Sequence, residues 1–375
     1  MIIELDIPRF KMNGLTVSPF VATLPKVELH VHIEGTLQPE LRWRLAQRNG
    51  ISLRLKDQEF HTFEQLLKSY DLKHNQRPQQ GGPQDGPSFL DTYAAGYEVL
   101  QKEQDFYELA MEYFTRCQEM NVRYVEPFFD IQSHARRGVA AEEVLNGYLR
   151  AQKDGVSKCG VHSNWIFCFL RDEAVEEGEA AYETVLPWAK RDGGHGLFHA
   201  VGLAGNACDR PPTLFKDAFE KARKDGLHTT VDCDFGHEYT REHARQAIFE
   251  MGVERIDHAL DILDDDELVD GLAQKDIGLT LCPHAYHQSI PTESLFPKLR
   301  HLLNQGVRFC INSDKPVYMH DVWIDGNMEM TFRLGELSKE DMVQLVRYSI
   351  DMSWAETRVK RFIHAELDSI DIDAT

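Results

Sequence analysis

The sequence lacks any long hydrophobic run. No stretch of its 375 residues approaches the roughly 20 consecutive apolar residues that a membrane-spanning helix needs, so a membrane is not an expected partner. The opening residues, MIIELDIPRFKMNG, carry acids and a proline where a signal peptide has a basic start and an apolar core. We therefore expect a cytoplasmic protein.

Excess positive charge is absent as well. The chain has 41 Lys and Arg against 61 Asp and Glu, a formal net charge of −20. A surface of this sign repels phosphate backbones and anionic lipids, which argues against nucleic acid as a partner. A small-molecule substrate is the expected partner, and the composition gives no indication of the oligomeric state.

Cysteine motifs and phosphate-binding loops are missing too. The seven cysteines have no regular spacing and include no Cys-x-x-Cys pair, so neither a disulfide framework nor a cysteine zinc site is expected. No Gly-x-Gly-x-x-Gly or Gly-x-x-x-x-Gly-Lys loop follows an early strand, which weighs against a doubly wound nucleotide-binding sheet.

What the sequence does contain is a repeated alternation of strand and helix patterns. Short apolar, β-branched runs are separated by amphipathic stretches such as 212–226, 242–252 and 265–276, which end near glycine or a charged turn. Eight such strands favour a TIM (β/α)8 barrel with additional helices, formed by residues 1–375 as one α/β domain. The runs are 27–33, 122–129, 164–170, 196–204, 227–233, 255–260, 277–283 and 307–314.

One segment breaks this pattern. Residues 71–88, DLKHNQRPQQGGPQDGPS, are rich in Gly, Pro, Gln and Asn. Such a composition buries little apolar surface, so we expect a flexible loop within the domain. It could cover a site or be an insertion without a role.

Polar residues collect at the predicted carboxyl ends of four strands. A barrel brings these ends together at the face where active sites lie. Strand alternation places His30 with His32 on one face, and Asp232 with Asp234 likewise. The full set is His30, His32, Asp232, Asp234, His258 and Asp314.

Imidazoles and carboxylates that converge on one point predict a site for one divalent metal ion. Nitrogen and oxygen ligands suit zinc first, with iron or manganese as alternatives. Each residue also has a plain structural interpretation. Asp232 and Asp234 would suit a helix N-cap. His258 would suit a hydrogen-bonded core position, and Asp314 in NSDKP a turn. The convergence of four strand ends favours the metal.

Several motifs follow one another along the chain, namely LPKVELHVHIEGTLQPEL, EPFFDIQSHARRGV, VGLAGN, RIDHAL, LTLCP and NSDKP. In this order and spacing they resemble the adenosine and adenine deaminases of the amidohydrolase superfamily. The chain resembles this family from about residue 24 to 350, and the HIEGTLQPE form is more similar to the adenine deaminase branch. The resemblance implies the barrel.

The resemblance also implies roles for individual residues. His30 and His32 match the family's first two zinc ligands. Asp314 matches its metal-binding aspartate, which also holds the attacking water, and His258 matches the histidine that helps to deprotonate that water. Glu34 matches the acid that lines the substrate pocket. A metal, a water and a base are thereby implied.

The sequence departs from the family at the end of the fifth strand. Where the family has His-Ala-Gly-Glu, this chain has Asp232-Cys233-Asp234-Phe235. We expect Asp232 to replace the third histidine ligand, because a carboxylate still binds a divalent ion, although it favours iron or manganese. Phe235 takes the place of the glutamate that protonates the purine ring, and phenylalanine cannot transfer a proton.

Further departures affect the substrate pocket. The family's second aspartate on strand eight is Lys315 here, with the opposite charge, and His284 and His287 follow strand seven where small polar residues are usual. Lys315 favours a negatively charged substrate such as a carboxylate, with a salt bridge at the barrel rim as the alternative. The residues expected to bind substrate are Glu34, Asp234, Lys315 and His284.

These changes predict a repurposed enzyme instead of an ordinary adenine deaminase. Its metal-activated water would attack an sp2 carbon of a small, carboxylate-bearing substrate, with deamination or ring opening as the outcome. Three alternatives stay open. The first is an aminopurine deaminase in which Asp234 or His237 supplies the missing acid. The others are a metal-assisted lyase or cyclase without net hydrolysis, and a catalytically inactive barrel that binds a ligand.

Overall fold

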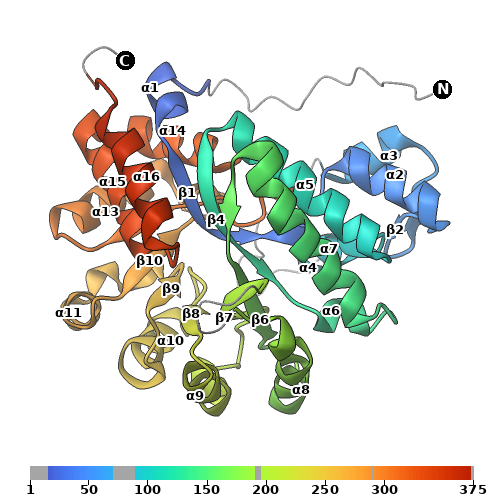
Figure 1. The fold of residues 1–375 in the computed structure, drawn as a ribbon. Helices are drawn as coiled ribbons and strands as arrows, with labels where there is room; N and C mark the ends of the chain where they lie inside the picture. Colours follow the sequence, from blue (N-terminus) through green and yellow to red (C-terminus); the bar gives the residue numbers. More distant parts are fainter. Residues whose placement is uncertain (1–15, 71–88, 191–195, 289, 373–375) are drawn as a thin grey trace.

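Parallel strands surrounded by helices make up the computed structural model (Figure 1), which describes residues 16–70, 89–190, 196–288 and 290–372. The strands follow the order β1-β4-β6-β7-β8-β9-β10-β11, and the short β5 pairs with β4. This arrangement confirms the predicted TIM (β/α)8 barrel with additional helices. The segment 71–88, predicted to be a flexible loop, lies outside the described residues.

Each predicted apolar run contains one strand of the barrel. Parallel strands covered by helices are buried on both faces, which is why they read as near-continuous apolar runs; all seven residues of β1 are buried. The strands are β1 (Lys26–His32), β4 (Val122–Phe129), β5 (His162–Ser163), β6 (Trp165–Leu170), β7 (Phe198–Ala204), β8 (His228–Asp232), β9 (Arg255–Asp257), β10 (Gly278–Leu281) and β11 (Phe309–Ile311), with β2 (Arg54–Leu55) and β3 (Gln58–Glu59) as a separate antiparallel pair.

The amphipathic stretches form helices between these strands. The stretch 212–226 forms a 3-10 turn and then α9, and 242–252 forms α10 followed by a π turn. The helices are α1 (Pro19–Thr23), α2 (Pro39–Asn49), α3 (Phe63–Tyr70), α4 (Phe89–Tyr97), α5 (Glu103–Glu119), α6 (Gln132–Ala135), α7 (Ala141–Asp154), α8 (Val175–Val185), α9 (Lys216–Lys224), α10 (Thr240–Gln246), α11 (Asp266–Lys275), α12 (Pro283–His287), α13 (Thr292–Asn304), α14 (Ile324–Leu334), α15 (Lys339–Met352) and α16 (Thr357–Asp368).

Backbone hydrogen bonds between β1 and the segment after β11 close the barrel. The His32 amide donates to the Asp314 carbonyl at 2.9 Å, and the Asp314 amide donates to the His30 carbonyl at 3.1 Å. Val31 and Asp314 form a parallel bridge between these bonds. The seam of the barrel therefore brings together three residues that the sequence predicts to be functional.

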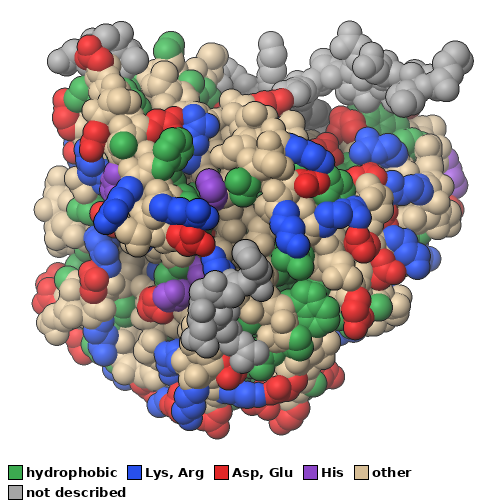
Figure 2. All heavy atoms as spheres, viewed as in Figure 1, with side chains coloured by type: hydrophobic (Ala, Val, Ile, Leu, Met, Phe, Trp, Pro, Cys, Tyr) green, Lys and Arg blue, Asp and Glu red, His purple; other side chains and the backbone are tan. Residues whose placement is uncertain are grey.

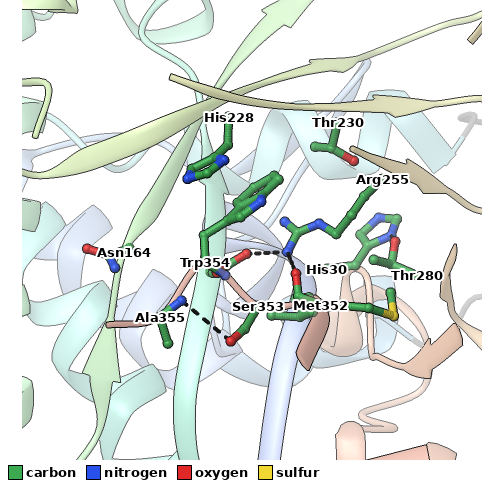
Figure 3. A network of polar contacts seen from close by, with 12 residues as sticks. His30, Asn164, His228, Thr230, Arg255, Thr280, Met352, Ser353, Trp354 and Ala355 are labelled. Atoms are coloured by element: carbon green, nitrogen blue, oxygen red, sulfur yellow. Dashed lines mark hydrogen bonds and ion pairs between the residues drawn. The ribbon is translucent and has the colours of Figure 1, made fainter. Parts of the chain in front are cut away.

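A stack of aromatic and charged groups lies at the starts of strands β8 and β9 (Figure 3). The guanidinium carbon of Arg255, at the start of β9, lies 3.4 Å from the centre of the Trp354 ring. His228, at the start of β8, stacks on Trp354 with ring centres 4.9 Å apart and planes 9° apart. Arg255 also donates to Glu126 at 2.5 Å. Because the face of a TIM barrel where the strands start serves stability, we assign the stack to holding the barrel together.

The molecular surface carries both signs of charge. Figure 2 shows acidic and basic side chains interspersed over one face. Within the described ranges, no helix is both long enough and apolar enough to cross a bilayer. The exclusion of nucleic acid as a partner rests on the net charge and stays a prediction.

Candidate metal centre and active site

Two histidines of β1 direct their imidazoles at one carboxylate. Strand alternation predicts this arrangement, and the ring centres of His30 and His32 lie 5.7 Å apart. The Nε2 atoms of His30 and His32 lie 3.7 and 3.6 Å, respectively, from Oδ1 of Asp314. The structure thus brings together three of the four predicted metal ligands.

Both imidazoles are neutral at physiological pH. Burial lowers the pKa of His30 to about 4, and the nearby His258 adds to this effect. Burial and the Lys315 ammonium hold the pKa of His32 well below its usual value. Neutral imidazole is the form that binds metal ions, so both rings can act as ligands without first losing a proton.

These residues fit a divalent metal ion. The Nε2 atoms of His30 and His32 are buried and have no hydrogen-bond partner in the described part of the chain, which is costly unless a ligand satisfies them. Ligands about 2.0–2.2 Å from a tetrahedral ion lie roughly 3.3–3.6 Å from each other, close to the separations from Asp314. A second group with ligand atoms within 4.8 Å of one another joins His30 to His258 and Cys282.

A chain of hydrogen bonds orients the His30 ring, which lies beside Thr280 in Figure 3. Nδ1 of His30 lies 3.0 Å from the Thr280 hydroxyl, which donates to Oδ1 of Asp257 at 2.6 Å. Thr230 donates to the other Asp257 oxygen at 2.8 Å. Because Thr280 gives its one proton to Asp257, it accepts from Nδ1–H of His30. Nε2 of His30 therefore keeps the lone pair that a metal needs.

Three site residues adopt a left-handed backbone conformation just beyond a strand end. The φ angles of Asp234, His258 and Asp314 are 61°, 65° and 60°. Residues other than glycine visit this region rarely, at a cost of roughly 1 kcal/mol or more each. Such strain clusters at functional sites, where the surrounding structure holds a side chain in one position.

Asp232 ends β8 and lies outside both groups of clustered ligand atoms found among the described residues. Its Oδ1 accepts from the Asp234 amide at 2.6 Å. Burial and the neighbouring Asp234 carboxylate raise the pKa of Asp232 to about 7, against the opposing effect of Arg171. The role of Asp232 as a metal ligand therefore stays a prediction.

Asp234 does not follow the alternation expected from the sequence. Strand β8 ends at Asp232, and the left-handed conformation of Asp234 breaks the extended geometry. Strand alternation therefore does not determine where the Asp234 carboxylate lies, and the prediction that the two carboxylates share one face stays a prediction. The Asp234 carboxylate lies 3.6 Å from Nε2 of His237 and accepts from the Tyr239 hydroxyl at 3.3 Å.

The predicted catalytic histidine, His258, lies next to the predicted metal ligand His30 and against aromatic side chains. Its ring centre is 4.6 Å from that of His30 and 5.3 Å from that of Phe235. Nδ1 of His258 lies 2.9 Å from the Tyr286 hydroxyl. The Phe235 ring, which has no proton to transfer, therefore borders the predicted catalytic histidine.

The Lys315 side chain lies against the candidate metal centre. Its Nζ lies 2.7 Å from Oδ1 of Asp314, the oxygen that faces the two imidazoles, and the Lys315 side chain is 13% exposed. Burial favours the protonated Asp314 carboxyl, yet the Lys315 ammonium and His30 hold the pKa of Asp314 well below its usual range. The salt bridge that the sequence left as an alternative does form, and it forms with a predicted metal ligand.

Glu34 is buried and held by two donors. Nε2 of His134 and the Tyr148 hydroxyl lie 3.1 and 3.0 Å from its Oε1. Nδ1 of His134 lies 2.6 Å from Nη2 of Arg137. A guanidinium only donates, so Nδ1 accepts and the proton of His134 points to Glu34. Burial raises the pKa of Glu34 to about 7. Its contact with a substrate stays a prediction.

His284 lies half-buried on α12, next to another histidine. Its ring centre is 5.8 Å from that of His320, and the two rings meet edge to face. Burial lowers the pKa of His284 to about 4, so it offers a neutral imidazole. A role in substrate binding is untested by this geometry and stays a prediction.

Few of the residues that support the site can be identified from the sequence. Thr280 and Asp257 are polar residues within apolar strand runs, which is a usable signal. Tyr286 carries no such signal. Neither does Arg171, a buried residue whose Nη2 donates to the Asp232 carbonyl at 2.5 Å. Their contacts depend on how loops that follow different strands meet.

The sequence profile of the adenosine deaminase family matches residues 25–370. An adenine deaminase from Acinetobacter baylyi is 38% identical over 94% of this chain and 99% of its own length. The crystal structure of an adenine deaminase from Arthrobacter aurescens has a TM-score of 0.80 at 31% identity, covering 92% of this chain and 98% of that one.

A more distant structure shares the fold. An amidohydrolase from Burkholderia ambifaria, solved with bound zinc, has a TM-score of 0.79 at 23% identity and covers 96% of this chain and 95% of its own. At that identity the likeness concerns the fold alone.

Proposed function

Because the chain belongs to the adenosine deaminase family, we propose that it is a metal-dependent hydrolase that acts at an sp2 carbon of a small anionic substrate. The substrate is a heterocycle with a carboxylate, and the reaction is loss of an amine or ring opening. One observation carries this proposal. The buried Nε2 atoms of His30 and His32, which have no hydrogen-bond partner among the described residues, face Asp314 beside the Lys315 ammonium.

His30, His32 and Asp314 would hold the ion, with Asp232 as a further ligand from β8. Zinc is the first choice, because the site offers two nitrogen donors and the zinc-bound amidohydrolase shares the fold. A bound divalent ion supplies a water with a pKa near 7, and hence a hydroxide at neutral pH.

Lys315 supports a negatively charged substrate. Its ammonium lies among buried groups and pairs with Asp314 at 2.7 Å. A divalent cation bound to the Asp314 carboxylate offsets its negative charge and weakens its attraction for the Lys315 ammonium. A substrate carboxylate then supplies the negative charge that compensates Lys315. Phe235 supports a reaction other than one in which this position protonates a purine ring, because a phenyl ring has no proton to transfer.

Deamination of an aminopurine is the second candidate, and the surroundings of Asp234 favour it. The Asp234 carboxylate contacts His237 at 3.6 Å and Tyr239 at 3.3 Å. Such a cluster could hold a proton and deliver it to a ring nitrogen, in place of the missing glutamate.

Turnover by zinc-loaded protein separates these candidates. Carboxylated amino-heterocycles and adenine are the two substrate classes, and wild type is compared with Lys315→Met and Asp234→Asn. We expect turnover of the carboxylated class, with kcat/KM lowered about tenfold or more in Lys315→Met. Lys298→Met, which removes a surface ion pair with Asp264, should have no effect. If the protein turns over adenine, and Asp234→Asn abolishes this activity whereas Lys315→Met does not, the second candidate is supported. Turnover of neither class contradicts both.

A further inference from the structure

Tyr286 makes two kinds of contact around His258. Its hydroxyl lies 2.9 Å from Nδ1 of His258, and its ring centre lies 4.4 Å from that of Phe235 at an interplanar angle of 69°. Tyr286 is fully buried on α12, the short helix after β10. Packing against Phe235 fixes the phenol in position, so the hydrogen bond fixes the His258 imidazole.

The protonation of the phenol sets the direction of this hydrogen bond. Burial holds the pKa of Tyr286 well above its usual value, so the hydroxyl keeps its proton. A buried hydroxyl needs an acceptor for its own proton, and Nδ1 of His258 lies within reach. A neutral imidazole accepts at Nδ1 only when Nε2 carries its proton.

We propose that Tyr286 is a positioning residue that holds His258 as the Nε2–H tautomer. His258 then acts as a hydrogen-bond donor to the oxygen that adds to the substrate carbon, where negative charge develops. In this tautomer Nε2 has no lone pair for the proton of a water, which differs from the base role that the family resemblance implies. The catalytic consequence rests on the proposed function, whereas the tautomer does not.

The tautomer can be measured on metal-free protein without any substrate. Long-range 1H–15N spectra of protein with 15N-labelled histidine distinguish the two neutral tautomers at about pH 8, where histidines are uncharged. His258→Asn identifies the His258 signals. We expect the Nε2–H form in the wild type, and a mixture of both tautomers in Tyr286→Phe. Tyr182→Phe, which removes a buried hydroxyl bonded to Asp225 at 2.8 Å, should leave His258 unchanged.

An Nδ1–H tautomer in the wild type overturns the proposal, and this result needs no variant to fold. An unchanged tautomer in folded Tyr286→Phe overturns it as well. If the protein is inactive but has the Nε2–H tautomer, the proposed function fails and the inference about Tyr286 stands. In active enzyme, we expect Tyr286→Phe to lower kcat roughly tenfold and to change KM little.

Discussion

Lys315 and Asp314 are neighbours in the chain and an ion pair in space, with Nζ 2.7 Å from Oδ1. The same oxygen lies 3.7 Å from Nε2 of His30 and 3.6 Å from Nε2 of His32. A divalent ion and the ammonium therefore compete for one carboxylate oxygen. In a buried site this repulsion between cations is only weakly screened.

Replacing Lys315 with methionine should therefore strengthen metal binding. Met keeps an unbranched apolar side chain and removes the charge, so we expect zinc affinity to rise about tenfold. Titration of zinc against a competing chelator measures this. Lys298→Met, at a surface pair with Asp264 3.0 Å away, is the matched control and should bind zinc as the wild type does. Equal or weaker binding by Lys315→Met would show that the ammonium does not oppose the metal.

Thr280→Val should weaken metal binding. The substitution removes the hydroxyl that accepts from His30 and donates to Asp257, and loss of such an outer partner typically lowers metal affinity about 10–100-fold. The same chelator titration applies. Thr229→Val is the control, because the Thr229 hydroxyl is buried on β8 without a hydrogen-bond partner among the residues that the structure describes. Wild-type affinity in Thr280→Val would refute the role of this chain of hydrogen bonds.

His134 should make stability depend on pH. Burial lowers its pKa from 6.5 to about 4, so below pH 6.5 the unfolded chain binds a proton that the folded protein does not. This contribution to stability is fully present above pH 6.5 and is lost as the pH falls towards 4, by on the order of 3 kcal/mol.

A matched variant isolates the effect of His134. His134→Gln keeps an amide donor for Glu34 but does not titrate, so its stability should fall less between pH 7 and pH 5. Urea unfolding of both proteins at the two pH values measures the difference. An equal fall in both would mean that His134 already binds its proton in the folded state.

Arg255→Met should destabilise the barrel and leave metal binding intact. Arg255 and Glu126 are both buried, with 2.5 Å between them. Removing one member of such a pair leaves an uncompensated charge and costs about 3–5 kcal/mol. Arg308→Met breaks a pair between a half-buried arginine and the exposed Asp276 and should cost about 1 kcal/mol or less. Urea unfolding measures both variants. Equal losses in the free energy of unfolding would contradict the assignment of the Arg255 stack to stability.

Much of the fold could be predicted because parallel, covered strands leave a strong pattern in the sequence. All seven residues of β1 are buried, and apolar residues occupy alternate positions along it. Alternation alone places His30 and His32 on one face. Both features depend on local geometry, which a short stretch of sequence determines.

The rest of the site could not be predicted because it depends on loops and on tertiary contacts. Asp234 does not follow strand alternation, because its backbone is left-handed with φ of 61°. The contact between Tyr286 and His258 joins residues 28 positions apart. The pairing of Lys315 with its neighbour Asp314 depends on side-chain conformation, which the residue types alone do not fix.

The metal content of untagged protein tests the central claim most directly. Elemental analysis compares wild type with His30→Ala and Asp232→Ala, each after exposure to zinc, iron and manganese. We expect about one equivalent per chain in the wild type, with loss in His30→Ala and in Asp232→Ala. Wild-type protein that retains none of the three metals would contradict the account of a metal-dependent hydrolase.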